Sequence, residues 1–121
     1  YNDALESRGA THPGKAQLKL PSEITGTHVY NQYTVRASSE SHRTHILARL
    51  AEANIGHSIY YPVPLHRQSC FSSLGYPEGA LPVTEEAAKT VFSIPVFPQL
   101  SEDEHRYVIE TLVTANESFQ G

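Results

Sequence analysis

The chain of 121 residues suits one domain, which at this size can bury roughly two-thirds of its unfolded surface. Its net charge is −4 with scattered Lys and Arg, and it has no apolar run near the roughly 20 residues of a membrane span, which argues against nucleic-acid and membrane partners. A single cysteine, Cys70, excludes an internal disulfide and suits a reducing compartment, so we expect a cytoplasmic protein.

The first third of the chain predicts a helix and then two strands. Residues 1–9, "YNDALESRG", have the pattern of a helix tail that stops at Gly9. The sequence contains no methionine and opens inside this pattern, so we expect a fragment of a longer protein. Turn formers surround a short predicted strand at 18–20, and residues 27–37 alternate as the clearest predicted strand.

The middle of the chain predicts a strand–helix–strand unit around a helix from His42 to Asn54. Serines in "SSESH" are N-cap candidates, and apolar residues recur at helical spacing up to position 53. Residues 55–61, "IGHSIYY", predict the second strand of this unit. Pro62 and Pro64 end it, because proline fixes its own φ and keeps the preceding residue out of the helical region.

The second half predicts three helical pieces. A short helix or helical turn follows Leu65 and stops at Gly75, and Thr84 to Phe92 form the next helix. After a proline-stiffened link, a capping box at Ser101 opens the last helix. The order of elements predicts an α+β fold, with a small antiparallel or mixed sheet and helices packed on one face.

Three groups of polar or reactive side chains have ordinary structural explanations. His42 and His45 are three apart on a helix but lack further ligands, so we expect exposed polar histidines and no metal site. Cys70 lies four residues after His66, yet no third group of a catalytic set accompanies them, and Cys70 is expected to be a small buried hydrophobe. Glu85 opens a helix, where the helix dipole favours negative charge.

Two segments retain a functional interpretation. Along residues 27–37, His28, Tyr30 and Gln32 share one strand face, and "HSIYYPVPLH" at 57–66 forms a stiff aromatic strut. If the strands on either side of the central helix pair, both segments present polar aromatic groups on one side of the sheet. Each signal is individually weak, because such a strand face is usually half-solvated sheet surface.

The same segments resemble a known family. "HVYNQYTVR", a helix ending in "LAEANIG", and then "IYYPVPLHRQSCFSSLGYPEGALPVTEEAAKTVFSIPVFPQLSEDE" in this order are similar to the C-terminal domain of the DegT/DnrJ/EryC1/StrS aminotransferases. The resemblance runs from the first residue to about residue 115. It implies the small domain of a fold type I enzyme that uses pyridoxal 5'-phosphate (PLP) to aminate nucleotide-linked keto-sugars. Residues 1–9 would then be the tail of an interdomain helix, with the N-terminal cofactor-binding domain absent.

The resemblance places the Schiff-base lysine, the aspartate on the pyridine nitrogen and the phosphate-binding groups in that absent domain. Lys15, Lys19 and Lys89 lie outside any such motif. We therefore expect that the isolated chain neither holds the cofactor covalently nor transaminates. The resemblance also implies a homodimer with shared active sites for the full-length enzyme, with an amino-acid donor and a nucleotide-sugar substrate.

Carried over position by position, the resemblance implies substrate contacts in the 27–37 strand and in the strut. Asn31 departs from many family members, which have histidine there, and this puts a proton-transfer role in doubt, although an amide can still donate to a hydroxyl. The seven candidates are His28, Tyr30, Asn31, His57, Ser58, Tyr60 and Tyr61.

Three readings stay open at this point. The leading one is an aminotransferase domain from polysaccharide, lipopolysaccharide or antibiotic sugar synthesis. The second is a dehydratase of the same family, in which histidine replaces the lysine. The third is a stand-alone binding module that kept the fold and lost the chemistry.

Overall fold

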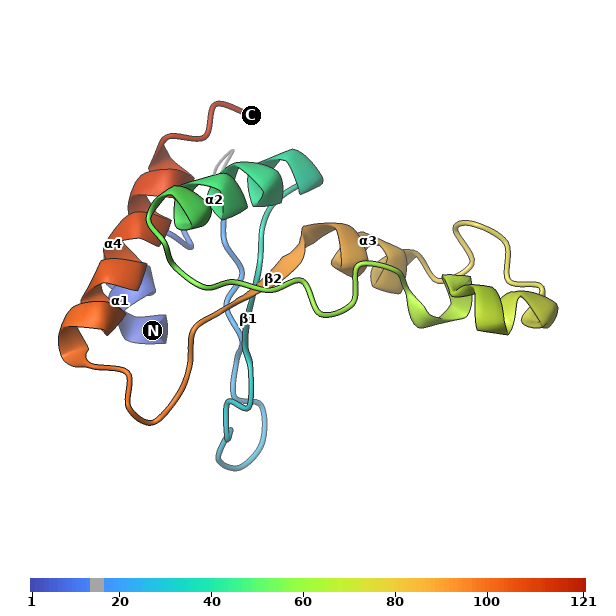
Figure 1. Cartoon of the computed structure of the whole chain (residues 1–121), viewed down its shortest axis with the longest axis horizontal. Helices are drawn as coiled ribbons and strands as arrows, with labels where there is room; N and C mark the ends of the chain where they lie inside the picture. Colours follow the sequence, from blue (N-terminus) through green and yellow to red (C-terminus); the bar gives the residue numbers. More distant parts are fainter. Residues whose placement is uncertain (14–16) are drawn as a thin grey trace.

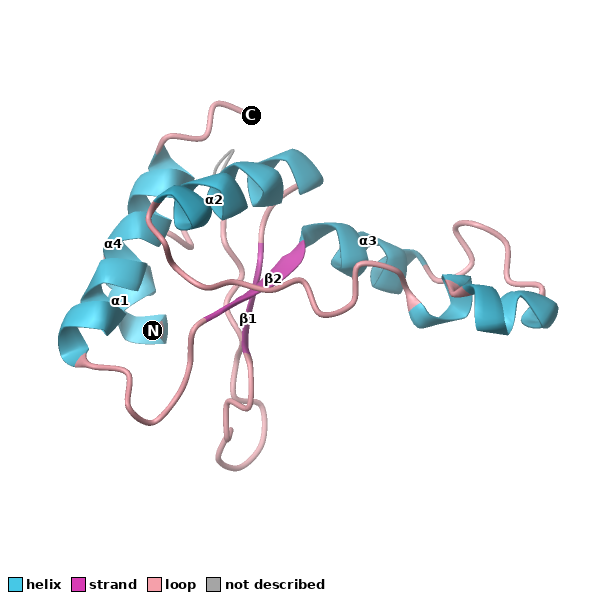
Figure 2. Cartoon of the chain, viewed as in Figure 1, coloured by secondary structure: helices cyan, strands magenta, loops and turns pink. Residues whose placement is uncertain are grey.

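The computed structural model describes residues 1–13 and 17–121, so Lys15 lies outside the described residues. Two strands and four α-helices are joined by loops and by two short 3₁₀ helices (Figure 2). In chain order they are α1 (Asn2–Ser7), β1 (Tyr33–Arg36), α2 (Glu40–Glu52), η1 (Leu65–Arg67), η2 (Ser69–Leu74), α3 (Pro82–Thr90), β2 (Val91–Ile94) and α4 (Glu102–Glu117).

The two strands form a small antiparallel sheet and confirm the predicted α+β fold, but the partner of β1 is β2 rather than the strand expected at 55–61. Tyr33 pairs with Ile94 and Arg36 with Val91, so β1 lies beside a strand almost 60 positions later in the chain. Two isolated bridges widen this sheet, from Lys19 to Arg36 and from Ser58 to Ser93. The first coincides with the short strand predicted at 18–20. The second attaches the predicted strut to the edge of β2.

The hydrophobic core lies between this sheet and the helices α1, α2 and α4 (Figure 1). Tyr33 and Val35 alternate inward from β1, and Ile46 and Leu50 of α2 are fully buried, as their helical spacing predicts. Each such aliphatic side chain contributes about 1.5–3 kcal/mol by leaving water. The largest fully buried side chains are Phe92, Leu5, Leu18, Ile46, Leu50, Leu112, His42, Val35 and Thr90.

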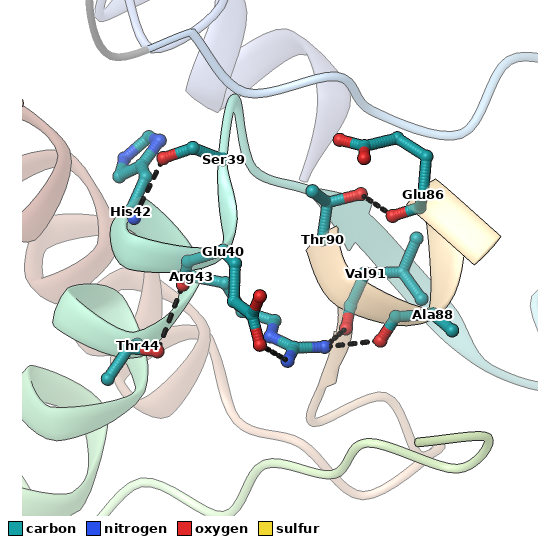
Figure 3. Close-up of polar contacts among 9 residues, drawn as sticks. All are labelled: Ser39, Glu40, His42, Arg43, Thr44, Glu86, Ala88, Thr90 and Val91. Atoms are coloured by element: carbon teal, nitrogen blue, oxygen red, sulfur yellow. Dashed lines mark hydrogen bonds and ion pairs between the residues drawn. The ribbon is translucent and has the colours of Figure 1, made fainter. Parts of the chain in front are cut away.

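Helix ends follow the sequence signals. The Ser39 hydroxyl accepts the backbone N–H of His42 at 3.1 Å and caps α2 (Figure 3). The predicted capping box of α4 is complete, with Ser101 and Glu104 each accepting the other's backbone N–H. Helix α1 confirms the helix predicted in residues 1–9, and Gly9 follows it at φ +75°, a conformation that favours glycine.

A buried arginine joins α2 to the end of α3. Arg43 donates from Nη1 to the carbonyl oxygens of Ala88 at 2.7 Å and Val91 at 3.4 Å, and its Nη2 lies 3.9 Å from Glu40 (Figure 3). Carbonyls in the last turn of a helix lack partners within the helix and carry its negative dipole end. Arg43 therefore satisfies the end of α3 and fixes it against α2.

The predicted strand over 27–37 is wrong in its first half. The strand starts only at Tyr33, and the preceding residues turn, with Tyr30 in the left-handed region at φ +46°. The Tyr30 N–H donates to His28 Nδ1 at 2.9 Å, which closes the turn, and the Tyr30 ring stacks on Tyr33 at 5.6 Å between centroids. Val29, which lies inside the predicted strand, is 87% exposed.

Two other boundaries differ from prediction. The expected strand at 55–61 reduces to the single bridge of Ser58. The helix expected up to Phe92 ends at Thr90, and Val91 and Phe92 begin β2. The run "VFSI" is short, apolar and rich in β-branched and aromatic residues, so pairing with β1 buries it better than one more helical turn.

Two residues have environments opposite to those expected. His42 is fully buried rather than exposed, stacked on Phe119 with ring centroids 4.6 Å apart. His45 is partly buried and contacts the hydroxyl of Ser118 at 3.0 Å. Cys70 is exposed rather than buried, because its short helix does not pack on the core.

Residues 60–83 form an arm that extends away from the core (Figure 1). It contains η1 and η2, neither of which has a buried residue, and α3 brings the chain back to the sheet. Gly75 ends η2 in the left-handed conformation at φ +68°, as predicted. The arm is thus attached to the body by the Ser58 bridge on one side and by α3 on the other.

Candidate functional site

An open hollow of about 350 Å³ lies where the strut crosses the end of β2. The Ser58–Ser93 bridge builds it: the Ser58 N–H donates to Ser93 O at 3.1 Å, and the Ser93 N–H donates to Ser58 O at 2.8 Å. This pairing holds 56–60 against β2, while the turn before β1 forms another wall. The lining residues are Asn31, Gln32, Gly56, His57, Ser58, Tyr60, Ser93, Ile94, Pro95, Val96 and Phe97.

Four of the seven predicted site residues share this hollow: Asn31, His57, Ser58 and Tyr60. They come from the two segments that the sequence singled out, but β2, the strand that brings these segments together, was not among the predicted strands. Asn31 and Tyr60 are exposed at its rim, whereas His57 and Ser58 are partly buried.

The hydrogen bond of His57 determines which of its ring nitrogens is free. His57 Nδ1 lies 3.0 Å from the carbonyl oxygen of Ile55. A carbonyl can only accept, so Nδ1 carries the hydrogen and donates it. In the neutral ring, Nε2 is then the hydrogen-bond acceptor. His57 can therefore accept a hydrogen bond from a hydroxyl, and Asn31 in the same hollow can both donate and accept.

His28 and Tyr30 lie elsewhere. Tyr30 lines a larger open hollow of about 820 Å³, together with Tyr1, Tyr33 and the chain around Leu20. His28 stacks on Tyr30 with ring centroids 4.2 Å apart. Burial raises the pKa of Tyr33, so its hydroxyl stays protonated at neutral pH and donates to Asn2 Oδ1.

Tyr61 is also separated from the hollow of Asn31 and His57. It lines a third hollow, on the arm, with Pro62, Val63 and Arg67. Tyr60 lines this third hollow as well as the hollow of Asn31 and His57, whereas Tyr61 lines only the third. The predicted set of seven thus divides over three places, and only the group around His57 forms one site.

The sequence did not single out Ser93 and Phe97, which line the same hollow. Ser93 is 6% exposed, and its hydroxyl lies 2.9 Å from that of Thr34, its partner in the β1–β2 register. A signal was present in "SIPVFP", which shares with "SIYYPVP" the initial Ser-Ile, a Pro-Val pair and a final proline. Short apolar runs ended by proline are typical of strands at a sheet edge.

The residues described do not make up a PLP site. Lys19 and Lys89 are both exposed, Lys19 on the backbone bridge to Arg36 and Lys89 in the last turn of α3. A lysine that forms a Schiff base needs a desolvated position or a neighbouring cation, which lowers its pKa, and neither lysine has a buried setting.

Other site chemistries find little support in the described ranges. Within residues 1–13 and 17–121, no three His, Cys, Asp or Glu side chains are grouped as ligands for a metal ion. His66 faces Glu85, with Nε2 3.1 Å from the carboxylate, and Cys70 Sγ lies 3.9 Å from Gln68 Oε1. No helix of the described chain is both long and apolar enough to cross a bilayer.

Comparison with known proteins identifies the family. The model of the DegT/DnrJ/EryC1/StrS aminotransferase family matches residues 1–113. The chain belongs to this family. A dTDP-3-amino-3,4,6-trideoxy-alpha-D-glucose transaminase of Micromonospora megalomicea is 39% identical over 114 residues, which cover 93% of this chain and 29% of that protein. A protein of Geobacillus stearothermophilus, named a pleiotropic regulatory protein, is 47% identical over 93 residues, 76% of this chain and 24% of the other.

Solved structures of the family show the same fold. DesV of S. venezuelae, crystallised with a ketimine intermediate, matches 98% of this chain with a TM-score of 0.74 and 27% identity. The PLP form of a putative sugar aminotransferase, Spr1654 of Streptococcus pneumoniae, matches 96% with a TM-score of 0.73 and 26% identity. The chain covers 32% and 29% of these two proteins. It therefore spans 24–32% of the length of the relatives named here.

Proposed function

We propose that residues 1–121 form the small domain of a PLP-dependent aminotransferase that transfers an amino group from an amino-acid donor to a nucleotide-linked keto-sugar. The observation that carries this proposal is the family match over residues 1–113. Relatives named as transaminases of dTDP- and UDP-linked sugars support the substrate class. The cofactor, when bound by the rest of the enzyme, supplies the electron sink for amino transfer.

In this proposal the hollow of Asn31 and His57 contacts the sugar. Its walls offer an amide, an imidazole acceptor and serine hydroxyls, and Tyr60 offers an apolar ring face. Sugars present alternating hydroxyls and C–H faces, and a few fixed polar groups beside aromatic rings suit such ligands. The domain carries net negative charge, so most cations for the diphosphate come from elsewhere in the enzyme.

The wider setting belongs to the same proposal. We expect the enzyme to be a cytoplasmic homodimer whose product enters polysaccharide, lipopolysaccharide or antibiotic synthesis. The relatives' names include transaminases of amino sugars and an erythromycin biosynthesis protein, which supports this setting. Residues 1–121 alone are expected to be inactive, because neither described lysine is placed to hold the cofactor.

The test uses the product of the gene that contains this sequence. Amino transfer is measured in two halves: release of 2-oxoglutarate from glutamate alone, and amination of a dTDP-linked 3-keto-sugar. Asn31→Ala and His57→Ala should each raise the KM for the nucleotide sugar by about tenfold and leave the glutamate half unchanged. The matched control is His12→Ala, which removes an exposed histidine.

The outcomes separate the alternatives. If both variants impair the glutamate half as strongly as the sugar half, the hollow is not a sugar site. A gene product that releases no 2-oxoglutarate with PLP present would refute the aminotransferase proposal. If such a protein still bound the nucleotide sugar saturably, the binding-module reading would replace it.

A further inference from the structure

The arm, residues 60–83, combines a fixed shape with an apolar surface that the body does not cover. Its large hydrophobic side chains are exposed, for example Tyr61 at 72%, Leu65 at 64% and Leu74 at 62%. Soluble monomers rarely expose contiguous apolar patches of this kind unless a partner covers them. Nine of the thirteen large hydrophobic residues that are exposed lie in this segment: Tyr60, Tyr61, Val63, Leu65, Phe71, Leu74, Tyr76, Leu81 and Val83.

The composition of the arm is that of an interface core. Arg67 and Glu78 are its only charged residues apart from His66, and four of the eleven aromatic residues of the chain fall within it. The buried centres of protein interfaces are depleted in charge and enriched in aromatic side chains in the same way. A charged partner, such as a nucleic acid or an acidic surface, would find little complementary charge here.

The tip of the arm contains an apolar hollow of about 340 Å³. Its lining is mostly hydrophobic and comes from η1, η2 and the loop before α3. A hollow of this size suits one large apolar side chain, which is how interface anchors are commonly seated. The residues that line it are Leu65, His66, Phe71, Leu74, Tyr76, Leu81 and Thr84.

Polar contacts hold this hollow open in the absence of a core. The Glu85 carboxylate accepts the N–H groups of Gly79 at 2.9 Å and Leu81 at 3.4 Å, and it contacts His66 Nε2 at 3.1 Å. The side chains of His66 in the arm and Glu85 in α3 are only 6% and 16% exposed. A surface shaped before binding loses less conformational freedom when it docks.

We propose that the arm docks on the remaining polypeptide of the aminotransferase, with one of its large apolar side chains in the hollow of Leu65, Phe71 and Leu74. This rests on the proposed function. The relatives are about three times as long as this chain, which supplies an occupant. The match to DesV takes in 98% of the chain and therefore nearly all of the arm, so the arm has a similar course where that longer polypeptide is present.

The test again uses the product of the gene that contains this sequence, with Leu74→Ser and Ile24→Ser as matched variants. Both remove a branched aliphatic side chain from an exposed position, at 62% and 88% exposure, but only Leu74 lines the hollow. Leu74→Ser should lower Tm by several degrees and Ile24→Ser by about one degree or less. Amide hydrogens of residues 69–74 should exchange at least about tenfold more slowly than in an unstructured peptide, and Leu74→Ser should abolish this protection.

Two results would overturn the proposal. One is exchange of the 69–74 amides as fast as in an unstructured peptide; the other is a Leu74→Ser protein as stable as Ile24→Ser. Cofactor absorbance and amino transfer are recorded on the same samples. An active enzyme with an unprotected arm refutes docking alone, whereas a protected arm in a protein without amino transfer refutes the proposed function alone.

Discussion

At the scale of single residues, Glu85 illustrates how one side chain shapes a surface segment. The N–H of Gly79 holds the pKa of the Glu85 carboxyl below its usual range, and the hydrogen bond from His66 acts in the same direction, against the opposing effect of burial. Glu85 therefore stays ionised near neutral pH and contacts three groups, the His66 ring and the N–H groups of Gly79 and Leu81. Its position at the start of α3 adds the favourable helix dipole that the sequence predicts.

Glu85→Gln should loosen the loop before α3. The amide retains only one acceptor oxygen, which would have to serve the Gly79 N–H, the Leu81 N–H and the His66 ring that the two carboxylate oxygens now share. Amide exchange at Gly79 should become about tenfold faster, as measured by NMR or mass spectrometry. Glu86→Gln is the control, since it removes the same charge from the exposed neighbouring position. Equal exchange rates in the two variants would show that Glu85 does not fix the loop.

At the scale of elements, the structure depends on how α3 meets α2. The contacts of Arg43 with Ala88 and Val91 join the two helices at the point where the chain passes from α3 into β2. Thr90 adds a second contact at this junction, because its hydroxyl donates to Glu86 O at 2.8 Å and accepts Arg36 Nε–H at 3.1 Å. The arm therefore has a rigid base even though its far end lacks a core.

Replacing Arg43 should lower the free energy of unfolding more than replacing an exposed arginine of the same helix. Arg43→Met keeps much of the aliphatic packing but leaves the carbonyls of Ala88 and Val91 without their charged donor, so the free energy of unfolding should fall by about 2 kcal/mol. Arg49→Met, which breaks only the exposed pair with Glu52, should change it by less than about 0.5 kcal/mol. Urea unfolding measures both values. A similar loss in the two variants would contradict the anchoring role of Arg43.

At the scale of the whole molecule, local signals predicted the helices well and the strand limits poorly. The caps at Ser39 and Ser101 and the apolar spacing of α2 and α4 act within a few residues, so the sequence alone reveals them. The turn at Tyr30 depends on stacking with Tyr33, and the change from helix to strand at Val91 depends on pairing with Arg36. Contacts of that kind join distant positions and leave little trace in local periodicity.

In the candidate site, too, local signals predicted some residues, and contacts between distant positions determined the others. Asn31, His57 and Tyr60 were singled out by their residue types and by the resemblance, and the structure places them in one hollow. Ser93 completes that hollow only because β2 pairs with the strut, and residue spacing carries no information on that bridge. Tyr61 shows the reverse error, since it lies outside that hollow although its neighbour Tyr60 lines it.

Acid stability depends on His42, which joins α2 to the C-terminal end of α4. Its Nδ1 accepts the Ser38 N–H at 3.2 Å, and its ring stacks on Phe119. Burial lowers the pKa of His42, the nearby His45 lowers it further, and a contact with Asn116 opposes them. The folded state thus holds a neutral ring that the unfolded chain protonates near its ordinary pKa of about 6.5.

The direction in which His42 changes stability with pH follows from the number of protons that the folded and unfolded states bind. The unfolded state binds more protons below about pH 6.5, so the contribution of His42 is complete above that pH and is lost as the pH falls toward the lowered folded pKa. Burial also lowers the pKa of His105, which adds to the same loss, whereas Glu85 and Glu104, whose pKa values are lowered, lose their contributions only in more acidic solution.

His42→Gln should therefore flatten the decline in stability between pH 7.5 and 5.5, although it lowers stability at pH 7.5 by removing a buried ring from the contact with Phe119. Urea unfolding at three pH values across this window measures the slope for the parent and the variant. His12→Gln, at an exposed position, should keep the parental slope. If the stability of His42→Gln fell as steeply with decreasing pH as that of the parent, protonation of other groups would cause the loss of stability in acid. His105 would be the first of these groups.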